Sequence, residues 1–336
     1  LKQRLDPTVT IMQGINSFIK KNQKRIVFAD GEDENTLKAA IAFKNSKLGI
    51  PILVGKESKI KEQIKNIGYS ENFDIEITNS KDEEKRKKYV NHLFKKLQRE
   101  QGLLERDCDR MVRNDRVVWA TSMVACGDAD GAVTGNTRRF GASLEKIKQV
   151  VDVRKGEIMF GLNMVVNKGK TIFIADTSVH EYPTSEEMAE IAISAARVVR
   201  LFGIEPKIAL CSHSQFGNLD SESGRNMRDA LKILDSKKCD FLYEGEMHSD
   251  AALDPELRSR IMPNCRFDGA ANALVFANTD AASGVRNILK MCANGLEVGP
   301  ILMGLGNKAH IVTPSITARG LLNISALAGS PVQTYG

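Results

Sequence analysis

The fold is decided by the stretch TIFIADTSVHEYPTSEEMAEIAISAARVVRLFGIEPKIALCS, residues 171–212. Its two ends, TIFIAD and KIALCS, are continuous apolar segments rich in β-branched residues, which predict buried strands. Between them, apolar residues from Met188 to Phe202 recur with the 3.6-residue period of a helix, and Thr184 and Glu187 form a capping box at its start. The stretch therefore predicts two parallel strands joined by a crossover helix.

Similar short apolar segments recur along all 336 residues and predict further strands. They are RIVFA (25–29), PILVG (51–55), GAVTG (131–135), ALVFA (273–277) and HIVTP (310–314). Continuous apolar strands that alternate with amphipathic helices favour an α/β fold with mostly parallel sheets, covered on both faces. Ligands of such folds bind beyond the carboxyl ends of the strands.

The charge pattern gives no reason to expect a nucleic-acid or membrane partner. The chain has 48 Lys and Arg against 42 Asp and Glu, a net charge of +6 spread over its length. The charge-dense segment 81–100 carries Tyr89, Leu93 and Leu97 on one stripe, which predicts a solvated outer helix. No apolar run approaches the roughly 20 residues needed to cross a bilayer, and the start lacks a secretory signal, so we expect a cytoplasmic protein.

The cysteines and the glycines exclude several kinds of site. Six scattered cysteines without a C-x-x-C pair fit reduced thiols better than disulfides or zinc ligands, and no metal site is expected. Gly55 and Lys56 do not complete a P-loop, because the spacing from Gly49 is wrong and Glu57 stands where Ser or Thr is needed. A dinucleotide fingerprint of the G-x-G-x-x-G type is also absent.

The segment GDADGAVTGNTRR, residues 127–139, places acids and glycines around a short strand and two arginines beyond it. Glycines permit close backbone approach to a phosphate, and an arginine can hold one. The alternative is a pair of tight turns with surface arginines. The candidate ligand-binding residues here are Asp130, Thr134, Gly135, Arg138 and Arg139.

The segment CSHSQFGN, residues 211–218, follows a predicted strand. Its alternation puts Ser212 and Ser214 on one face and His213 on the other, which argues against a Ser-His nucleophilic pair between these neighbours. The two hydroxyls suit a polar ligand, although turn-forming serines are the alternative.

Acidic residues also follow predicted strands. Asp176, Glu246 and Asp250 are candidates for the ligand-binding cleft, where they could bind a metal or act in proton transfer, with helix caps and turn acids as the commoner alternative. The histidines do not cluster in the sequence, so a zinc site is not expected.

Taken in order, these segments resemble the phosphotransacetylase family from about Arg25 to the C-terminus. RIVFADGEDENTLKAA resembles the opening strand and helix of that family, GDADG its central turn, and FGIEPKIALCSHS its strand into the Ser-x-Ser loop. Within the family, ADTSVHEYPTSEEMAEIA, SHSQFGN, YEGEMHSDAAL and VGPILMGL are most similar to the C-terminal phosphotransacetylase-like domain of bacterial NADP-dependent malic enzymes. LDPT near the start resembles the junction after the malic domain, and with Leu1 as first residue we expect a domain detached from that catalytic domain.

The resemblance implies an architecture. We expect two three-layer α/β subdomains of the isocitrate/isopropylmalate dehydrogenase-like (phosphotransacetylase) fold, one formed by residues 1–143 and 297–336, and a second inserted at residues 144–296. It also implies dimerisation through the inserted subdomain and a cleft that binds acetyl-CoA or coenzyme A. In that cleft Arg138 or Arg139 would lie near the phosphates, and Ser212 and Ser214 near the pantetheine or acyl end.

The departures from the family concern catalysis. Active phosphotransacetylases carry a Ser-Arg pair and an aspartate near the C-terminus, and the aligned positions hold Thr313, Pro314 and Gly320. An acyl phosphate needs a guanidinium or an equivalent set of donors, which proline does not offer, and glycine cannot deprotonate a thiol. Glu145 stands where many transferases have an arginine. No catalytic residue is therefore expected.

The leading hypothesis is a regulatory and oligomerising domain that binds acetyl-CoA and lacks acyltransferase activity. The complete malic enzyme would oxidatively decarboxylate malate to pyruvate with NADP and a divalent metal, both bound by the malic catalytic domain in cis. The alternatives are an active phosphate acetyltransferase that uses Ser214 with Asp176 or Glu246, a domain that only assembles the oligomer, and, more distantly, a dehydrogenase.

Overall fold

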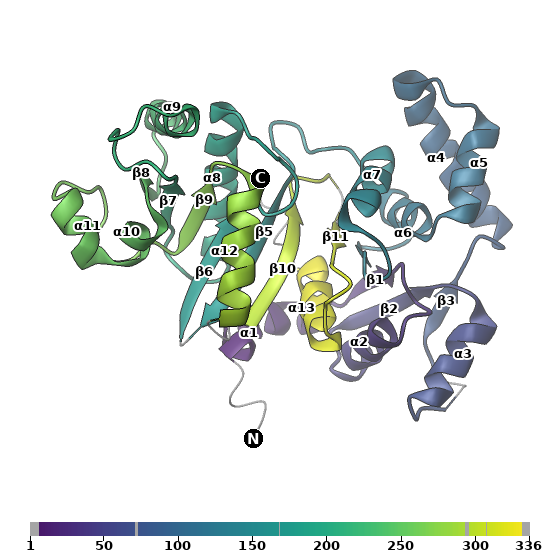
Figure 1. The fold of residues 1–336 in the computed structure, drawn as a ribbon. Coiled ribbons are helices and arrows are strands. Elements are labelled where there is room, and N and C mark those ends of the chain that lie inside the picture. The colour runs from purple at the N-terminus through teal and green to yellow at the C-terminus, as the bar shows by residue number, and fades with distance from the viewer. Residues whose placement is uncertain (1–6, 71–72, 168, 293–295, 307, 331–336) are drawn as a thin grey trace. The chain divides into compact units, whose positions relative to one another are not determined.

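The computed structural model describes residues 7–70, 73–167, 169–292, 296–306 and 308–330 (Figure 1). The described residues divide into two compact units. We name them after their sheets: the five-stranded unit contains residues 13–154 and 305–330, and the six-stranded unit contains residues 7–12 and 155–304. These divisions, at 154/155 and 304/305, lie after the expected boundaries at 143/144 and 296/297. The difference arises because a helix that starts at Phe140 packs in the five-stranded unit and a strand from Leu296 pairs in the six-stranded sheet.

In the five-stranded unit, strands mostly alternate with helices along the chain. They are α1 (Pro7–Lys21, which begins in the other unit), β1 (Lys24–Phe28), α2 (Glu34–Asn45), β2 (Gly49–Val54), α3 (Glu57–Asn66), β3 (Glu76–Thr78), α4 (Glu83–Gln101), α5 (Glu105–Asn114), α6 (Arg116–Ala125), β4 (Gly131–Thr134), α7 (Phe140–Val150), β11 (Ala309–Ile311) and α13 (Ala318–Gly329). The sheet order is β11-β4-β1-β2-β3, and all neighbours pair in parallel. Helices α2 and α13 pack together against it, and α6 packs on the sheet with α4, α5 and α7 next to it.

The six-stranded unit adds an antiparallel pair to a parallel sheet. Its elements are β5 (Phe160–Asn167), β6 (Lys170–Ala175), α8 (Ser185–Leu201), β7 (Lys207–Cys211), α9 (Glu222–Lys237), β8 (Leu242–Met247), α10 (Ser249–Leu253), α11 (Pro255–Ile261), β9 (Ala273–Phe276), α12 (Thr279–Cys292) and β10 (Leu296–Met303). The sheet order is β10-β5-β6-β9-β7-β8. Strands β6, β9, β7 and β8 are parallel, whereas β5 runs opposite to both of its neighbours.

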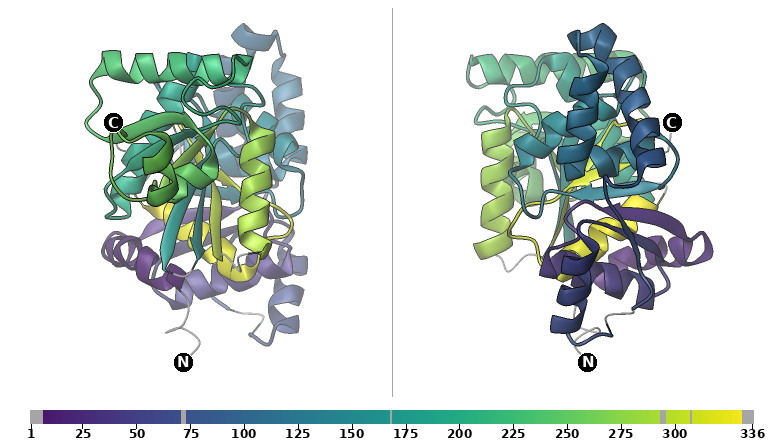
Figure 2. Two further views of the ribbon diagram at one scale, coloured as in Figure 1. Left: turned by 60° about the vertical axis from the view of Figure 1, so that its left-hand side comes forward. Right: turned by 90° about the vertical axis from the view of Figure 1, so that its right-hand side faces the viewer.

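Alternating side chains of the parallel strands fill two apolar layers. Ile174, Cys211, Leu274 and Phe276 pack in one cluster with Ala282 of α12. Their neighbours in the strands point the other way, and there Phe173 contacts Phe202 at the end of α8, with ring centroids 5.4 Å apart. Both faces of this sheet are therefore covered by helices, with α12 in front of it in Figure 1 and α8 and α9 better seen in Figure 2.

The predicted α/β fold with mostly parallel sheets is confirmed, and so are the main local predictions. Each of the seven predicted strands coincides with a strand of the structure. Helix α8 begins after Thr184, whose side chain accepts the N–H of Glu187 in the predicted capping box. In α4, the stripe formed by Tyr89, Leu93 and Leu97 is buried and the charged residues face outward.

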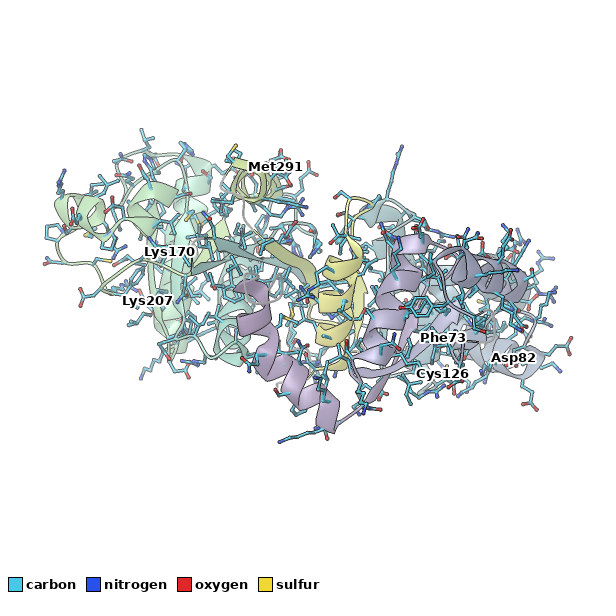
Figure 3. All side chains as sticks on the ribbon, turned by 90° about the horizontal axis from the view of Figure 1, so that it is seen from below. Phe73, Asp82, Cys126, Lys170, Lys207 and Met291 are labelled. Carbon is cyan, nitrogen blue, oxygen red and sulfur yellow. The ribbon has the colours of Figure 1, made fainter. Side chains whose placement is uncertain are left out.

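Three further features of the described residues bear on function. No helix among them is long and apolar enough to cross a membrane. All six cysteines are free thiols, of which Cys108 and Cys211 are buried and Cys292 is exposed. Lys170 and Lys207 mark the amino ends of β6 and β7 at one edge of the six-stranded sheet (Figure 3), so the candidate residues that follow these strands lie at the opposite edge.

Candidate ligand site

The Ser-x-Ser loop follows β7, and its two serines have different environments. Ser214 is completely buried, and its hydroxyl donates to Glu246 Oε1 at 2.7 Å. Ser212 is half-buried, its N–H donates to the Met247 carbonyl, and its hydroxyl accepts the N–H of Ser214. The loop therefore presents Ser212 to ligands, while Ser214 holds the loop to the sheet.

Glu246 is the centre of the contacts that hold this loop. Its carboxylate is fully buried, and Oε1 accepts the N–H of Gly217 and an Nη1–H of Arg228, both at 2.8 Å, besides the Ser214 hydroxyl. A buried carboxylate is tolerated when it is paired and hydrogen-bonded in this way. Because neither the Ser214 hydroxyl nor Glu246 is exposed, the pair does not reach a substrate as a nucleophile and base.

Asp176, at the end of β6, binds its own turn. Oδ1 accepts the N–H groups of Gly161, Ser178 and Val179, and Oδ2 accepts the N–H of His180 and contacts its Nδ1 at 2.9 Å. The side chain is 2% exposed. This is the arrangement of a turn acid, and within the described residues the Asp176 carboxylate makes no hydrogen bond to Ser214.

Two adjoining cavities open at the carboxyl ends of β7 and β9. One has a volume of about 710 Å³ and the other about 400 Å³. They share His213, Ser223, Ala277 and Asn278. Ser212 lines the smaller cavity, whose wall is otherwise largely apolar, formed by Cys211, Phe276, Ala281 and Val285. Clefts of this size and place suit a small-molecule ligand.

Most of these cavity residues are not among the candidates that the sequence pattern predicts. His213, which is predicted to lie on the face away from the two serines, is exposed and lines both cavities, and its Nδ1 lies 3.4 Å from Ser223 Oγ. Asn278 follows the predicted strand 273–277 at its carboxyl end, a signal that could have found it. Tyr182, Ser223 and Asn226 carry no such signal, because they come from the β6–α8 loop and from α9.

Cys211 lies in the wall of the smaller cavity but is not a reactive thiol. Burial raises its pKa to about 12, so the sulfur stays protonated near neutral pH. Since the thiolate is the nucleophile, this cysteine contributes apolar surface to the cavity.

In the five-stranded unit, the glycine turn after β4 is filled by an acid of the same unit. The N–H groups of Gly135 and Asn136 donate to Asp30 Oδ2, each at 3.1 Å, and Thr137 donates its hydroxyl to Asp30 Oδ1. Gly135 has a φ of +101° and lies so close to β11 that a Cβ would be 2.4 Å from the Val312 carbonyl oxygen. The donors that could cradle a phosphate are thus bound to Asp30. Asp30 is not among the predicted site residues, although it directly follows a predicted strand.

The two arginines beyond this turn differ in their availability. Arg138 donates to Asp115 Oδ2 at 2.8 Å, which holds it to the start of α6. The Arg139 side chain is exposed and makes no hydrogen bond or ion pair in the described part of the chain. Glu145 is exposed on α7. Arg139 is therefore the cation of this segment that an anionic ligand can recruit without breaking a contact.

The remaining candidates do not gather at one place. Asp130 lies before β4, where it accepts the N–H of Arg25, so it is at the opposite end of the strand from Thr134. The Thr134 hydroxyl is buried and has no partner among the described residues. Asp250 is exposed in the first turn of α10 and accepts the N–H of Ala251.

The segment after β11 offers no charged group at the three positions singled out for catalysis. Thr313 Oγ1 lies 3.1 Å from the Ser315 hydroxyl, Pro314 is exposed, and the Gly320 N–H donates to Thr317 at the start of α13. Among the described residues, no group of three or more His, Cys, Asp or Glu side chains is placed to hold a metal ion.

Residues 10–329 match the sequence pattern of the family described as phosphate acetyl/butaryl transferase. The chain belongs to this family. The family assignment confirms the resemblance found in the sequence and covers both compact units.

Known proteins of two kinds are similar to this member of the phosphate acetyl/butaryl transferase family. The NADP-dependent malic enzyme of Rhizobium meliloti (strain 1021) is 37% identical, over 98% of this chain and 43% of that protein. The phosphate acetyltransferase of Clostridium acetobutylicum is 29% identical, over 94% of this chain and 97% of that protein. The chain therefore spans less than half the length of the malic enzymes that it matches.

Solved structures share the fold of this family member. A phosphotransacetylase from Streptococcus pyogenes superposes with a TM-score of 0.89 at 24% identity, covering 97% of this chain and 99% of that one. The EutD phosphotransacetylase from Staphylococcus aureus gives a TM-score of 0.84 at 23% identity, covering 96% and 98%. At these identities the likeness establishes the fold.

Proposed function

We propose that this chain is the acetyl-CoA-binding regulatory and oligomerising part of an NADP-dependent malic enzyme and has no acyltransferase activity of its own. The similarity to malic enzymes over nearly the whole chain supports the context. The observation that carries ligand binding is the pair of adjoining cavities beyond β7 and β9, reached by the Ser-x-Ser loop. The apolar wall of the smaller cavity suits the pantetheine arm, with Ser212 as a polar contact.

We propose that the chain does not catalyse acyl transfer because the segment after β11 lacks the side chains that this reaction needs. Transfer of an acyl group between phosphate and a thiol develops charge that a cationic fork of donors stabilises, and it needs a base for the thiol. Thr313, Pro314 and Gly320 supply neither a guanidinium nor a carboxylate. The Ser214–Glu246 pair does not replace them, because Arg228 is bound to the carboxylate and Ser214 is buried.

Calorimetric titration of the chain with acetyl-CoA tests binding. We expect saturable binding that is weakened by filling the smaller cavity with Ala281→Phe, since Ala281 is exposed on α12 and lines that cavity. Gly284→Phe, on the same helix but without a place in the cavity wall, is the matched control. No heat and no shift in melting temperature with acetyl-CoA would overturn the binding proposal.

A second assay separates the regulatory proposal from its competitor, an active phosphate acetyltransferase. It measures phosphate-dependent release of coenzyme A from acetyl-CoA with a thiol reagent, beside a true phosphotransacetylase. We expect no release above the uncatalysed rate. Turnover within a few orders of magnitude of the control enzyme would establish the transferase instead.

Regulation is tested on the full-length protein. A coupling free energy of about 1–3 kcal/mol between acetyl-CoA and the malic site would alter malate kinetics measurably. NADP and the divalent metal are proposed to bind the rest of that protein, outside this chain. Unchanged malate kinetics at saturating acetyl-CoA would refute the regulatory role.

Assembly is the remaining part of the proposal. We propose a homodimer formed through the six-stranded unit, and the apolar surface of α12 supports it, because Ile288 and Met291 are 62% and 73% exposed. Figure 3 labels Met291 on this helix. Sedimentation of the chain should give a dimer, and a variant carrying Ile288→Asp with Met291→Asp should give a monomer. A dimer that persists in the double variant would place the interface elsewhere.

A further inference from the structure

Tyr182 is an exposed aromatic side chain in the wall of the larger cavity. It lies in the loop between β6 and α8, and 73% of its surface is exposed. A large ring left in water forgoes the stabilisation that burial would give it. Pro183 follows it and fixes the backbone on one side, so the ring is presented from a locally restrained loop. A planar ligand can recover that surface by stacking on the ring.

The charge of this cavity decides which planar group fits. Its described lining contains no lysine or arginine, and Glu222 supplies a negative charge. A phosphate group in this cavity would meet the Glu222 carboxylate, and His213 is the one side chain of the described lining that could carry a compensating positive charge. The lining therefore favours a neutral planar group, such as a nucleobase, over the phosphates of a nucleotide.

Polar side chains in the same lining can recognise the edge of a base. The hydroxyls of Thr184 and Ser221 are already used, as caps of α8 and α9, and Asn278 Oδ1 accepts the N–H of Ala281. Asn226 on α9 is different, since its amide makes no hydrogen bond within the described residues. An amide offers a donor and an acceptor side by side, the pattern that pairs with N7 and the amino group of adenine.

We propose that Tyr182 and Asn226 form a subsite for an adenine ring, with the ring stacked on Tyr182 and its edge bound by Asn226. The subsite rests on the proposed function when the adenine is that of acetyl-CoA, because the larger cavity adjoins the one assigned to the pantetheine arm. A free adenine nucleotide offers the same ring, so the experiment must distinguish the two sources.

The test combines a residue change with a ligand truncation. Calorimetry measures the affinity of the full chain and of Tyr182→Ala for coenzyme A and for 4′-phosphopantetheine, which lacks the adenosine part. Loss of base stacking on an aromatic side chain weakens binding by about 5- to 150-fold. We expect a loss in that range for coenzyme A, less than about twofold for 4′-phosphopantetheine, and retention of affinity in Tyr182→Phe.

Two further variants sharpen the assignment. Asn226→Leu removes the amide and should weaken coenzyme A while leaving 4′-phosphopantetheine unchanged. Tyr69→Ala removes a tyrosine that is 41% exposed in the five-stranded unit and should change neither affinity. Because Tyr182 is exposed, its replacement should leave the melting temperature of the free protein unchanged, which separates loss of binding from loss of folding.

The outcomes distinguish this subsite from the proposed function. If coenzyme A binds and Tyr182→Ala changes its affinity by less than twofold, the subsite is wrong and the proposed function stands. Equal losses for coenzyme A and 4′-phosphopantetheine also overturn the subsite. If coenzyme A does not bind but AMP does, and Tyr182→Ala weakens AMP, the subsite stands for a free nucleotide and the proposed function fails.

Discussion

The buried carboxylate of Glu246 forms an ion pair with one cation among the described residues, Arg228. Arg228 Nη1 lies 2.8 Å from Glu246 Oε1, and Glu246 has no exposed surface. Removing one partner of a buried pair leaves an uncompensated charge and costs about 3–5 kcal/mol. We expect Arg228→Met to lower the free energy of unfolding by about that amount, as measured by urea denaturation at pH 7.

The same helix provides the control for this prediction. Arg225 of α9 pairs with Asp220, but the two side chains are 53% and 80% exposed. Exposed ion pairs contribute about 0–1 kcal/mol, so Arg225→Met should change the free energy of unfolding by no more than that. Equal effects of the two variants would mean that the Glu246 pair does not stabilise the Ser-x-Ser loop.

His310 should make the stability of the chain depend on pH. Complete burial, with the charge of Lys308 nearby, lowers the pKa of His310 to about 3 in the folded chain. The unfolded chain binds this proton below its ordinary pKa of about 6.5, whereas the folded chain does not. Stability therefore falls as the pH drops from about 6.5 towards 3, by up to about 1.4 kcal/mol per pH unit.

Urea denaturation at pH 7 and pH 5 measures this effect. We expect the loss between these two values to be smaller in His310→Gln, by about 2 kcal/mol, because the variant side chain does not titrate. An identical loss in both proteins would show that protonation of His310 in the unfolded chain does not cause the pH dependence.

The helices and strands that the sequence predicted correctly are those whose apolar pattern or capping signal is local and uninterrupted. The seven predicted strands have continuous apolar segments, and α8 carries its capping box in the sequence. Four strands of the described residues were not predicted. β3 has three residues, β8 (LYEGEM) carries two glutamates, and β10 (LEVGPILM) is interrupted by Gly299-Pro300, where its pairing with β5 shifts register. β5 (FGLNMVVN) pairs in antiparallel fashion with β6 and β10, outside the pattern of strands and crossover helices that guided the prediction.

The site was predicted in part for the same reason. The rule that ligands bind at carboxyl ends of strands located Ser212, which lines a cavity. The contact of Ser214 with Glu246 depends on β7 and β8 being neighbours, and strand order is set by packing between distant segments. Asp30 beneath the Gly135 turn depends likewise on the pairing of β1 with β4. Contacts across the sheet therefore required the structure.

Replacing glycine by alanine should have opposite effects on stability in the turn after β4 and in helix α1. Gly135 has a positive φ and no space for a Cβ, whereas nothing lies within 4 Å of a Cβ placed on Gly14 in the middle of α1. Gly135→Ala should lower the free energy of unfolding by about 1–3 kcal/mol. Gly14→Ala should raise it by about 0.5–1 kcal/mol, since alanine is the better helix former. Thermal and urea denaturation measure both, and a neutral Gly135→Ala would show that the turn relaxes without cost.

At the scale of the whole molecule, each compact unit has its own sheet and its own buried core, so we expect two unfolding transitions. Arg228→Met and Gly135→Ala lie in different units and should lower different transitions. The two cavities belong to the six-stranded unit, so acetyl-CoA at about 100 times its dissociation constant should stabilise the transition that Arg228→Met lowers, by about 2.7 kcal/mol. Differential scanning calorimetry of the chain, the two variants and the acetyl-CoA complex measures these shifts. A single transition moved equally by both variants would show that the units unfold together, and stabilisation confined to the other transition would place the ligand in the five-stranded unit.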